Sequence, residues 1–124
     1  MTALLVLLLG LAGGLGAVAR FVVDGVVRAR VRSALPAGTI FINVSGSFLL
    51  GLLAGATLHG APAALQAIAG TGFLGGYTTF STASVETVRL IQAGRVGMAA
   101  ANALVTLVLS LATAALGLWI GLIW

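Results

Sequence analysis

The chain has 124 residues, of which 60% are hydrophobic and 6% are charged, and its mean hydropathy is +1.22. A soluble domain carries about 25% charged residues, so this composition excludes a water-soluble monomer and predicts an all-α integral membrane protein. The formal net charge of +4 reflects six arginines that form no basic cluster with interleaved aromatic residues, which excludes nucleic acid as a partner. The absence of cysteine excludes disulfides and thiolate metal sites.

Four apolar stretches predict four transmembrane helices, at about residues 3–27, 34–58, 61–91 and 96–122. Each stretch is longer than the ~20 residues that cross a hydrocarbon core of about 30 Å. Short polar segments separate them: RARVRS at 28–33, HGAP at 59–62 and QAGR at 92–95. We therefore expect one transmembrane domain over residues 1–124, a multi-pass protein in the lipid of the cell membrane.

The first predicted helix carries two charged residues near its end, Arg20 and Asp24, four positions apart. One interpretation is an ion pair at the membrane interface, with the arginine reaching toward the lipid headgroups. The other interpretation is that Arg20 is a fixed positive charge that attracts an anion into a vestibule. The sequence leaves both open.

Small and polar residues recur at four-residue spacing, which places them on one face of a helix. Glycine pairs of this kind, which allow close contact between helices in lipid, are Gly10 with Gly14, Gly51 with Gly55, Gly72 with Gly76, and Gly117 with Gly121. Polar stripes combine Asn43 with Ser47 on the second helix, and Asn102, Thr106, Ser110 and Thr113 on the fourth. Such side chains often only join helices by hydrogen bonds, but two stripes together with the third stretch favour a polar pathway.

The third stretch contains glycines at 70, 72, 75 and 76, followed by hydroxyl side chains on both sides of Phe80. A glycine costs about 1 kcal/mol relative to alanine inside a helix, so the cluster predicts a break near residues 75–78, at mid-membrane. Backbone groups freed there must be buried or line a cavity, and free carbonyls can bind a cation. The hydroxyls and the positive edge of the Phe80 ring suit a small anion. No carboxylate pair, nucleophile with its base, or metal-ligand cluster indicates an enzyme.

Three segments in order resemble the CrcB/Fluc family of fluoride channels: GGLGAVARF at 13–21, GTIFINVSGSFLLG at 38–51 and GGYTTFST at 75–82. The resemblance implies a fluoride-selective channel that lets fluoride leave the cytoplasm passively and so relieves its toxicity. It also implies an antiparallel, dual-topology dimer with two pores and a structural Na+ at its centre. The sodium ligands would be the backbone carbonyls of Gly75 and Thr78. The implied pore residues are Asn43, Phe80, Ser81, Thr82 and Ser110, with Arg20 at the vestibule.

One position departs from the family pattern, because Ala83 stands where the family has a second pore phenylalanine. This departure keeps open a homodimer, a heterodimer with an oppositely oriented paralogue, and a non-conducting partner subunit. A small proton-coupled multidrug exporter is a further alternative, in which only Asp24 could serve as the membrane carboxylate. All arginines except Arg20 lie near the first and third loops. This bias predicts insertion mostly in one orientation, with both termini outside, and favours the heterodimer.

Overall fold

The computed structural model describes residues 2–124, and this part of the chain consists of helices and their connections, without strands. Three helices are long and apolar enough to cross a membrane: α1 (Ala3–Arg30), α2 (Ala37–Leu58) and α6 (Val96–Ile123). Between α2 and α6 lie α3 (Ala63–Leu65), the π-helix η1 (Gln66–Leu74), α4 (Gly75–Tyr77) and α5 (Ser81–Gln92). The protein is therefore a multi-pass membrane protein, as its composition predicts.

The ends of the first two long helices differ from the predicted bounds. α1 continues past residue 27 to Arg30, and the basic residues of its last turn interact favourably with the negative end of the helix dipole. α2 begins at Ala37 instead of residue 34, directly after Pro36. A proline suits the start of a helix, but it disfavours helical geometry in the residue before it. The connection between α1 and α2 therefore spans residues 31–36.

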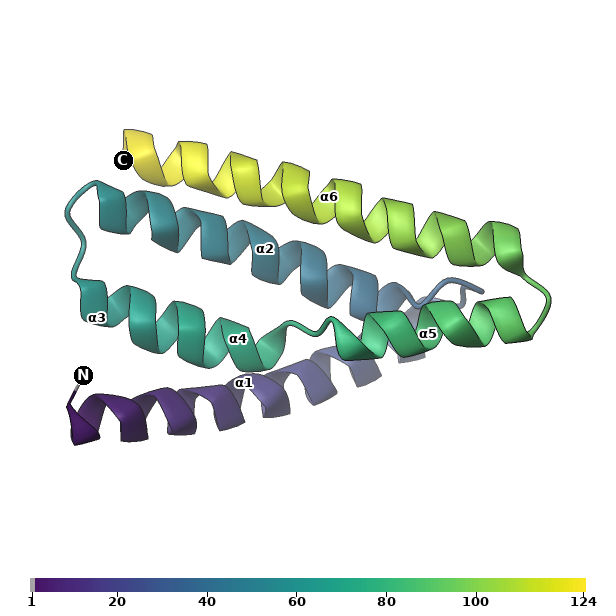
Figure 1. Ribbon diagram of the computed structural model, residues 1–124, viewed down its shortest axis with the longest axis horizontal. Helices are drawn as coiled ribbons and strands as arrows, with labels where there is room; N and C mark the ends of the chain where they lie inside the picture. The colour runs from purple at the N-terminus through teal and green to yellow at the C-terminus, as the bar shows by residue number, and fades with distance from the viewer. Residues whose placement is uncertain (1) are drawn as a thin grey trace.

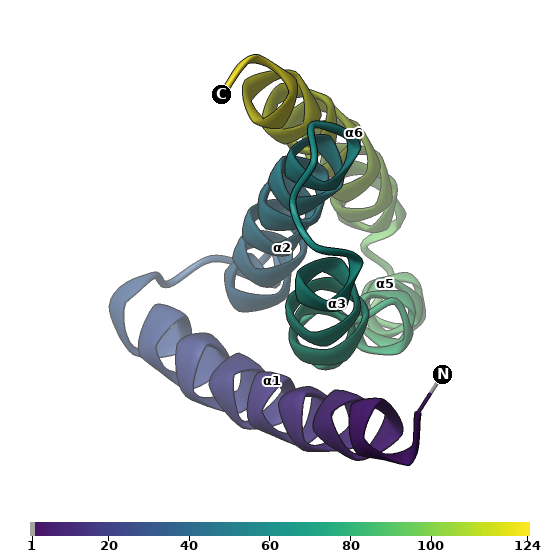
Figure 2. The same cartoon turned by 90° about the vertical axis from the view of Figure 1, so that its left-hand side faces the viewer.

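The helices pack in two main groups. α2 packs along α6, whereas α1 packs against η1 and α4. Seen end-on, α1 and α6 lie at opposite edges of the molecule, with α2 and the segment from α3 to α5 between them (Figure 2). The two termini and the turn after α2 lie at one end, and the α1–α2 connection and the α5–α6 turn lie at the other (Figure 1).

Glycines make the closest contacts between these helices. A methyl group added at Gly51 of α2 or Gly117 of α6 would overlap a backbone carbonyl oxygen of the other helix. In the same way, Gly76 of α4 lies against the backbone of Gly13 in α1. The sequence prediction of close contact is thus confirmed for these stripes. The pair Gly10 and Gly14 differs, since an added methyl group there would meet no atom of residues 2–124 within 4 Å.

The break in the third stretch lies later than the glycine cluster predicts. Gly75 and Gly76 are helical, and regular geometry ends at Tyr77. Thr78 has an extended backbone (φ −77°, ψ 158°), and α5 begins at Ser81. The predicted range 75–78 is therefore wrong for residues 75–77. Gly76 packs against Gly13 of α1, which offsets the cost of glycine at that position, and neither glycine interrupts its helix.

Candidate functional site

One side chain from α2 holds the interruption that follows Tyr77. The amide of Asn43 pairs with both polar groups of the Thr79 backbone: Nδ2 donates to the Thr79 carbonyl oxygen (2.8 Å), and Oδ1 accepts from the Thr79 N–H (2.8 Å). Both residues are buried, with exposed fractions of 9% for Asn43 and 8% for Thr79. Backbone outside a helix must find such partners in a membrane. Asn43 therefore supplies Thr79 with the hydrogen bonds that a continuous helix would have provided.

Neighbouring side chains secure the same segment. The Thr79 hydroxyl accepts from the Thr82 N–H (3.1 Å), a contact typical of a residue that caps the start of a helix, here α5. The Thr78 hydroxyl donates to a carbonyl of the preceding turn (2.9 Å). The phenol oxygen of Tyr77 lies 3.0 Å from the Ser45 hydroxyl of α2. Hydrogen bonds therefore hold the interruption in a defined conformation, linking it to α2 on one side and to α5 on the other.

A cleft of about 690 Å³ opens beside the break, between α2, α5 and α6. Phe80 lines it with 88% of its surface exposed, and Ala83 lies one turn farther along the same wall. Polar side chains of all three helices and of the break share this space; the principal ones are Asn43, Ser47, Thr79, Asn102, Thr106 and Ser110. The exposed ring and the polar stripes of α2 and α6 therefore face one cleft.

The stripe on α6 has unused hydrogen-bonding capacity. Among residues 2–124, the hydroxyls of Thr106 and Ser110 and the Oδ1 atom of Asn102 are buried without a partner. The Asn102 amide donates to the Thr87 hydroxyl (2.8 Å) and so ties α6 to α5. Buried polar atoms without partners are unusual, since each costs about 1–3 kcal/mol. Their four-residue spacing places them in a row along the wall of the cleft, where they lack the partners that a polar ligand would supply.

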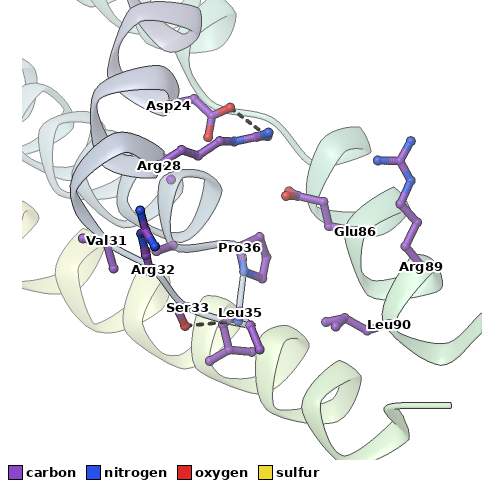
Figure 3. Close-up of a pocket in the computed structure, with 13 residues that line it drawn as sticks. Asp24, Arg28, Val31, Arg32, Ser33, Leu35, Pro36, Glu86, Arg89 and Leu90 are labelled. Carbon is purple, nitrogen blue, oxygen red and sulfur yellow. Dashed lines mark hydrogen bonds and ion pairs between the residues drawn. The ribbon is translucent and has the colours of Figure 1, made fainter. Parts of the chain in front are cut away.

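A second cavity, of about 740 Å³, lies at the arginine-rich end of the molecule (Figure 3). Asp24 and Arg28 of α1 form an ion pair there (2.9 Å), and Glu86 extends toward them from α5. Arg32 and Arg89 also line this cavity. The first interpretation of the Arg20–Asp24 spacing is therefore wrong, because Asp24 pairs with the arginine one turn later.

Comparison with known proteins identifies the family. The family profile described as CrcB-like protein, Camphor Resistance (CrcB), matches residues 7–118, which include the break and both cavities. The chain belongs to the CrcB family.

Several curated CrcB relatives are similar over most of their length. Fluoride-specific ion channel FluC 1 of Leifsonia xyli subsp. xyli is 54% identical over 122 residues, covering 98% of this chain and 89% of the relative. Fluoride-specific ion channel FluC 2 of Mycobacterium bovis is 48% identical over 110 residues, covering 89% and 85%. Fluoride-specific ion channel FluC of Syntrophotalea carbinolica is 47% identical over 110 residues, covering 87% and 89%.

The site residues that the CrcB resemblance implies lie in different parts of the structure. Asn43, Phe80 and Ser110 line the cleft beside the break, together with Thr78. Two others, Ser81 and Thr82, lie on another face of α5 and line a smaller cavity of about 280 Å³ with Glu86 and two arginines. Arg20 is half-buried on α1 and does not line any of these three cavities of the described chain. Gly75 is exposed on α4.

The contacts of two residues at the site come from the structure and not from the sequence. Thr79 lies inside the quoted motif, but its partner Asn43 is 36 positions away, and a single sequence carries no signal for that pairing. The sequence does place Thr106 in the polar stripe, midway between Asn102 and Ser110. Only the structure shows that its hydroxyl has no partner within residues 2–124.

Proposed function

We propose that this chain is a subunit of a fluoride-selective channel, and not an enzyme, that lets fluoride leave the cytoplasm down its gradient and so relieves fluoride toxicity. The observation that carries the proposal is the cleft beside the break, where the hydroxyls of Thr106 and Ser110 have no partner within residues 2–124. The names of the relatives, which are fluoride-specific ion channels, support the choice of anion.

An anion inside the membrane needs donors that replace its water shell. Thr106 and Ser110 suit this role because their hydroxyls are not used elsewhere in the described chain, and hydrogen bonds to a charged partner are about twice as strong as neutral ones. Asn43 adds a donor, since its amide group has two N–H bonds and gives one to Thr79. The exposed Phe80 ring presents the positive edge of its quadrupole to the same space.

The arginine-rich end of the chain fits the entrance of the pathway. Cavities lined by charges of one sign raise the local concentration of the opposite ion, and three arginines outnumber two acidic residues around the second cavity. Ser81 and Thr82 provide hydroxyls close to Arg28. Arg20 lies on α1 outside this cavity, and its vestibule role remains part of the proposal.

We also propose that the working form is an antiparallel dimer in the inner or plasma membrane. Residues 63–92 would form the fourth crossing, broken at mid-membrane, because η1 packs against α2 and α5 continues beside α6 toward the other end of the molecule (Figure 1). Within one chain Phe80 is 88% exposed, and a methyl group added at Gly10 or Gly14 of α1 would meet no neighbouring helix of residues 2–124. A second chain would cover these surfaces and close the open side of the cleft.

A structural Na+ at the dimer centre is part of this proposal. Thr78 leaves helical geometry, and unwound backbone carbonyls are typical sodium ligands in membrane proteins. Residues 2–124 contain no group of three or more His, Cys, Asp or Glu side chains that could hold a metal ion. The carbonyls of Gly75 and Thr78 therefore suit a monovalent cation, whose charge would hold the two broken segments together.

The partner in this dimer is proposed to be an oppositely oriented paralogue. Arg28, Arg30, Arg32, Arg89 and Arg95 all belong to one end of the molecule, and the turn at residues 59–62 has no Lys or Arg. A chain with such a bias inserts mainly one way, so an antiparallel arrangement needs a second chain with the opposite bias. Ala83 supports the same conclusion, since a paralogue could supply the missing aromatic side chain.

Fluoride efflux from liposomes tests the proposal. Vesicles loaded with fluoride would contain this chain alone, the paralogue alone, or both, with chloride-loaded vesicles as the selectivity control. We expect fluoride flux above that of empty vesicles, largest when both chains are present. No flux in any combination would contradict the channel assignment. Equal flux from the paralogue with and without this chain would favour the non-conducting partner subunit. The exporter alternative has less support, because its required carboxylate, Asp24, is paired with Arg28.

A further inference from the structure

Around the break, two side-chain oxygens accept hydrogen bonds that the carbonyls of Gly75 and Thr78 would accept in a continuous helix. In a continuous α-helix, each N–H donates to the carbonyl four residues earlier. The Thr79 N–H would then bind the Gly75 carbonyl, and the Thr82 N–H would bind the Thr78 carbonyl. Instead, the Thr79 N–H donates to Asn43 Oδ1 (2.8 Å), and the Thr82 N–H donates to Thr79 Oγ1 (3.1 Å).

The loss of regular helical hydrogen bonds is confined to the break. One residue earlier, the Thr78 N–H still donates to the carbonyl of Leu74 (2.9 Å), as in a regular helix. Beyond the break, the Ser84 N–H donates to the carbonyl of Phe80 (2.9 Å). Regular helical hydrogen bonding therefore stops after the Thr78 N–H and resumes at the Ser84 N–H, and the interrupted carbonyls of residues 75–78 include the two that the proposed function assigns to sodium.

We infer that Asn43 and the Thr79 hydroxyl are positioning residues that keep the Gly75 and Thr78 carbonyls free to bind the cation. The inference rests on the proposed sodium site. It gives Asn43 a role apart from that of an anion donor, since the residue acts on the cation through the backbone of Thr79. Burial of both residues shields the arrangement from water, which would otherwise compete for the same N–H groups.

Removing either side chain has a defined structural consequence. Without Asn43, the N–H and the carbonyl of Thr79 would be buried without partners, which is unfavourable in a membrane. The nearest remedy is to extend the helix, so that the Thr79 N–H binds the Gly75 carbonyl and withdraws it from the cation. Loss of groups that orient metal ligands typically lowers metal affinity about 10- to 100-fold, and we expect a loss of that size here.

The test is sodium-dependent thermal stability of the purified full-length protein, assembled with its paralogue if that proves necessary. Samples are prepared and melted in NaCl or in N-methylglucamine chloride, and the rise of the melting temperature with sodium concentration gives the affinity. Asn43→Ala and Thr79→Val should show weak or no sodium response. Thr79→Ser, which keeps the hydroxyl, should restore it.

Matched controls repeat the same substitutions away from the break. Asn102→Ala removes the other asparagine of the chain, which binds Thr87. Thr57→Val removes a hydroxyl that donates to the Leu53 carbonyl within α2 (2.9 Å). Both variants should keep the wild-type sodium affinity even if their melting temperatures fall, because neither residue touches the break.

The possible results separate this inference from the channel assignment. A folded Asn43→Ala protein with wild-type sodium affinity would overturn the inference. If the Asn43→Ala variant does not fold, Thr79→Val provides the test, and an unchanged sodium affinity in Thr79→Val would overturn the inference as well. Fluoride flux in a wild-type protein with no sodium response would overturn the inference and leave the channel assignment intact. A sodium response that Asn43→Ala abolishes, in a protein without flux, would support the inference and contradict the channel.

Discussion

Ser110 and Thr113 lie about one turn apart on α6, and their hydroxyls have different surroundings. The Thr113 hydroxyl donates to the Val44 carbonyl of α2 (3.0 Å), so it joins two helices. The Ser110 hydroxyl is buried in the wall of the cleft without a partner in residues 2–124. A satisfied hydroxyl contributes to stability, whereas an unsatisfied one lowers it unless a ligand is bound.

Replacing these two hydroxyls should therefore separate flux from stability. Ser110→Ala should lower fluoride flux about tenfold or more, since a hydrogen bond to a charged partner is worth about 1.5–3 kcal/mol and 1.36 kcal/mol corresponds to a tenfold change in rate. Its free energy of unfolding should stay the same or rise slightly. Thr113→Val should lose about 1 kcal/mol of stability and keep its flux. Liposome efflux and detergent unfolding measure both quantities, and wild-type flux in Ser110→Ala would remove Ser110 from the pathway.

At the scale of the helix, α2 and α6 share the most extensive interface within residues 2–124. Gly51 and Gly55 of α2 face Gly117 and Gly121 of α6 so closely that an added methyl group would strike backbone atoms of the opposite helix. Gly97, at the start of α6, has no atom of residues 2–124 within 4 Å of such a methyl group. The same glycine-to-alanine substitution can therefore be compared at a closely packed position, Gly117, and at an open position, Gly97, of one helix.

The alanine substitutions at these glycines should have opposite effects on stability. Gly97→Ala should leave the protein unchanged or stabilise it by up to about 1 kcal/mol, the difference in helix propensity. Gly117→Ala gains the same propensity, but overpacking costs about 1–3 kcal/mol, so the variant should be neutral to destabilised by about 2 kcal/mol and less stable than Gly97→Ala. Unfolding in detergent provides the comparison. If Gly117→Ala were the more stable of the two variants, the contact would not be as close as the structure places it.

At the scale of the whole molecule, charge is concentrated at one end. The α1–α2 connection and the α5–α6 turn lie together at that end, opposite both termini (Figure 1). The arginines of the last turns of α1 and α5 are at the same end. Short loops rich in arginine stay on the cytoplasmic side, so this end should face the cytoplasm.

Cysteine labelling in intact cells tests that orientation, and the absence of natural cysteine makes each label unambiguous. An impermeant thiol reagent should label His59→Cys, in the turn after α2, and not Ser33→Cys, in the α1–α2 connection. His59 is preferred to Gly60, whose φ of 109° would strain a cysteine. Equal labelling of both positions in cells expressing this chain alone would indicate insertion in both orientations, and the argument for an oppositely oriented paralogue would fail.

Features of the fold that depend on local composition and spacing can be predicted from the amino-acid sequence. Long apolar runs locate the helices, with α6 beginning at Val96 and α2 ending at Leu58 as predicted, because burial in lipid depends on composition over about 20 residues. Four-residue spacing identified the glycine contacts and the polar stripe of α6, because helix geometry brings such residues to one face. The CrcB motifs identified the family for the same reason, since they are contiguous in the chain.

The partners that these residues take depend on how the helices pack. Spacing allows Asp24 to pair with an arginine four positions before it or four after it, and the fold selects Arg28. The glycines at 75 and 76 could have broken their helix, but both stay helical, with Gly76 packed against Gly13 of α1, and the break lies at Thr78. The pairing of Asn43 with Thr79 joins residues 36 positions apart. Each of these outcomes depends on the competition between a local preference and a distant contact, and that competition is settled only when the helices have packed.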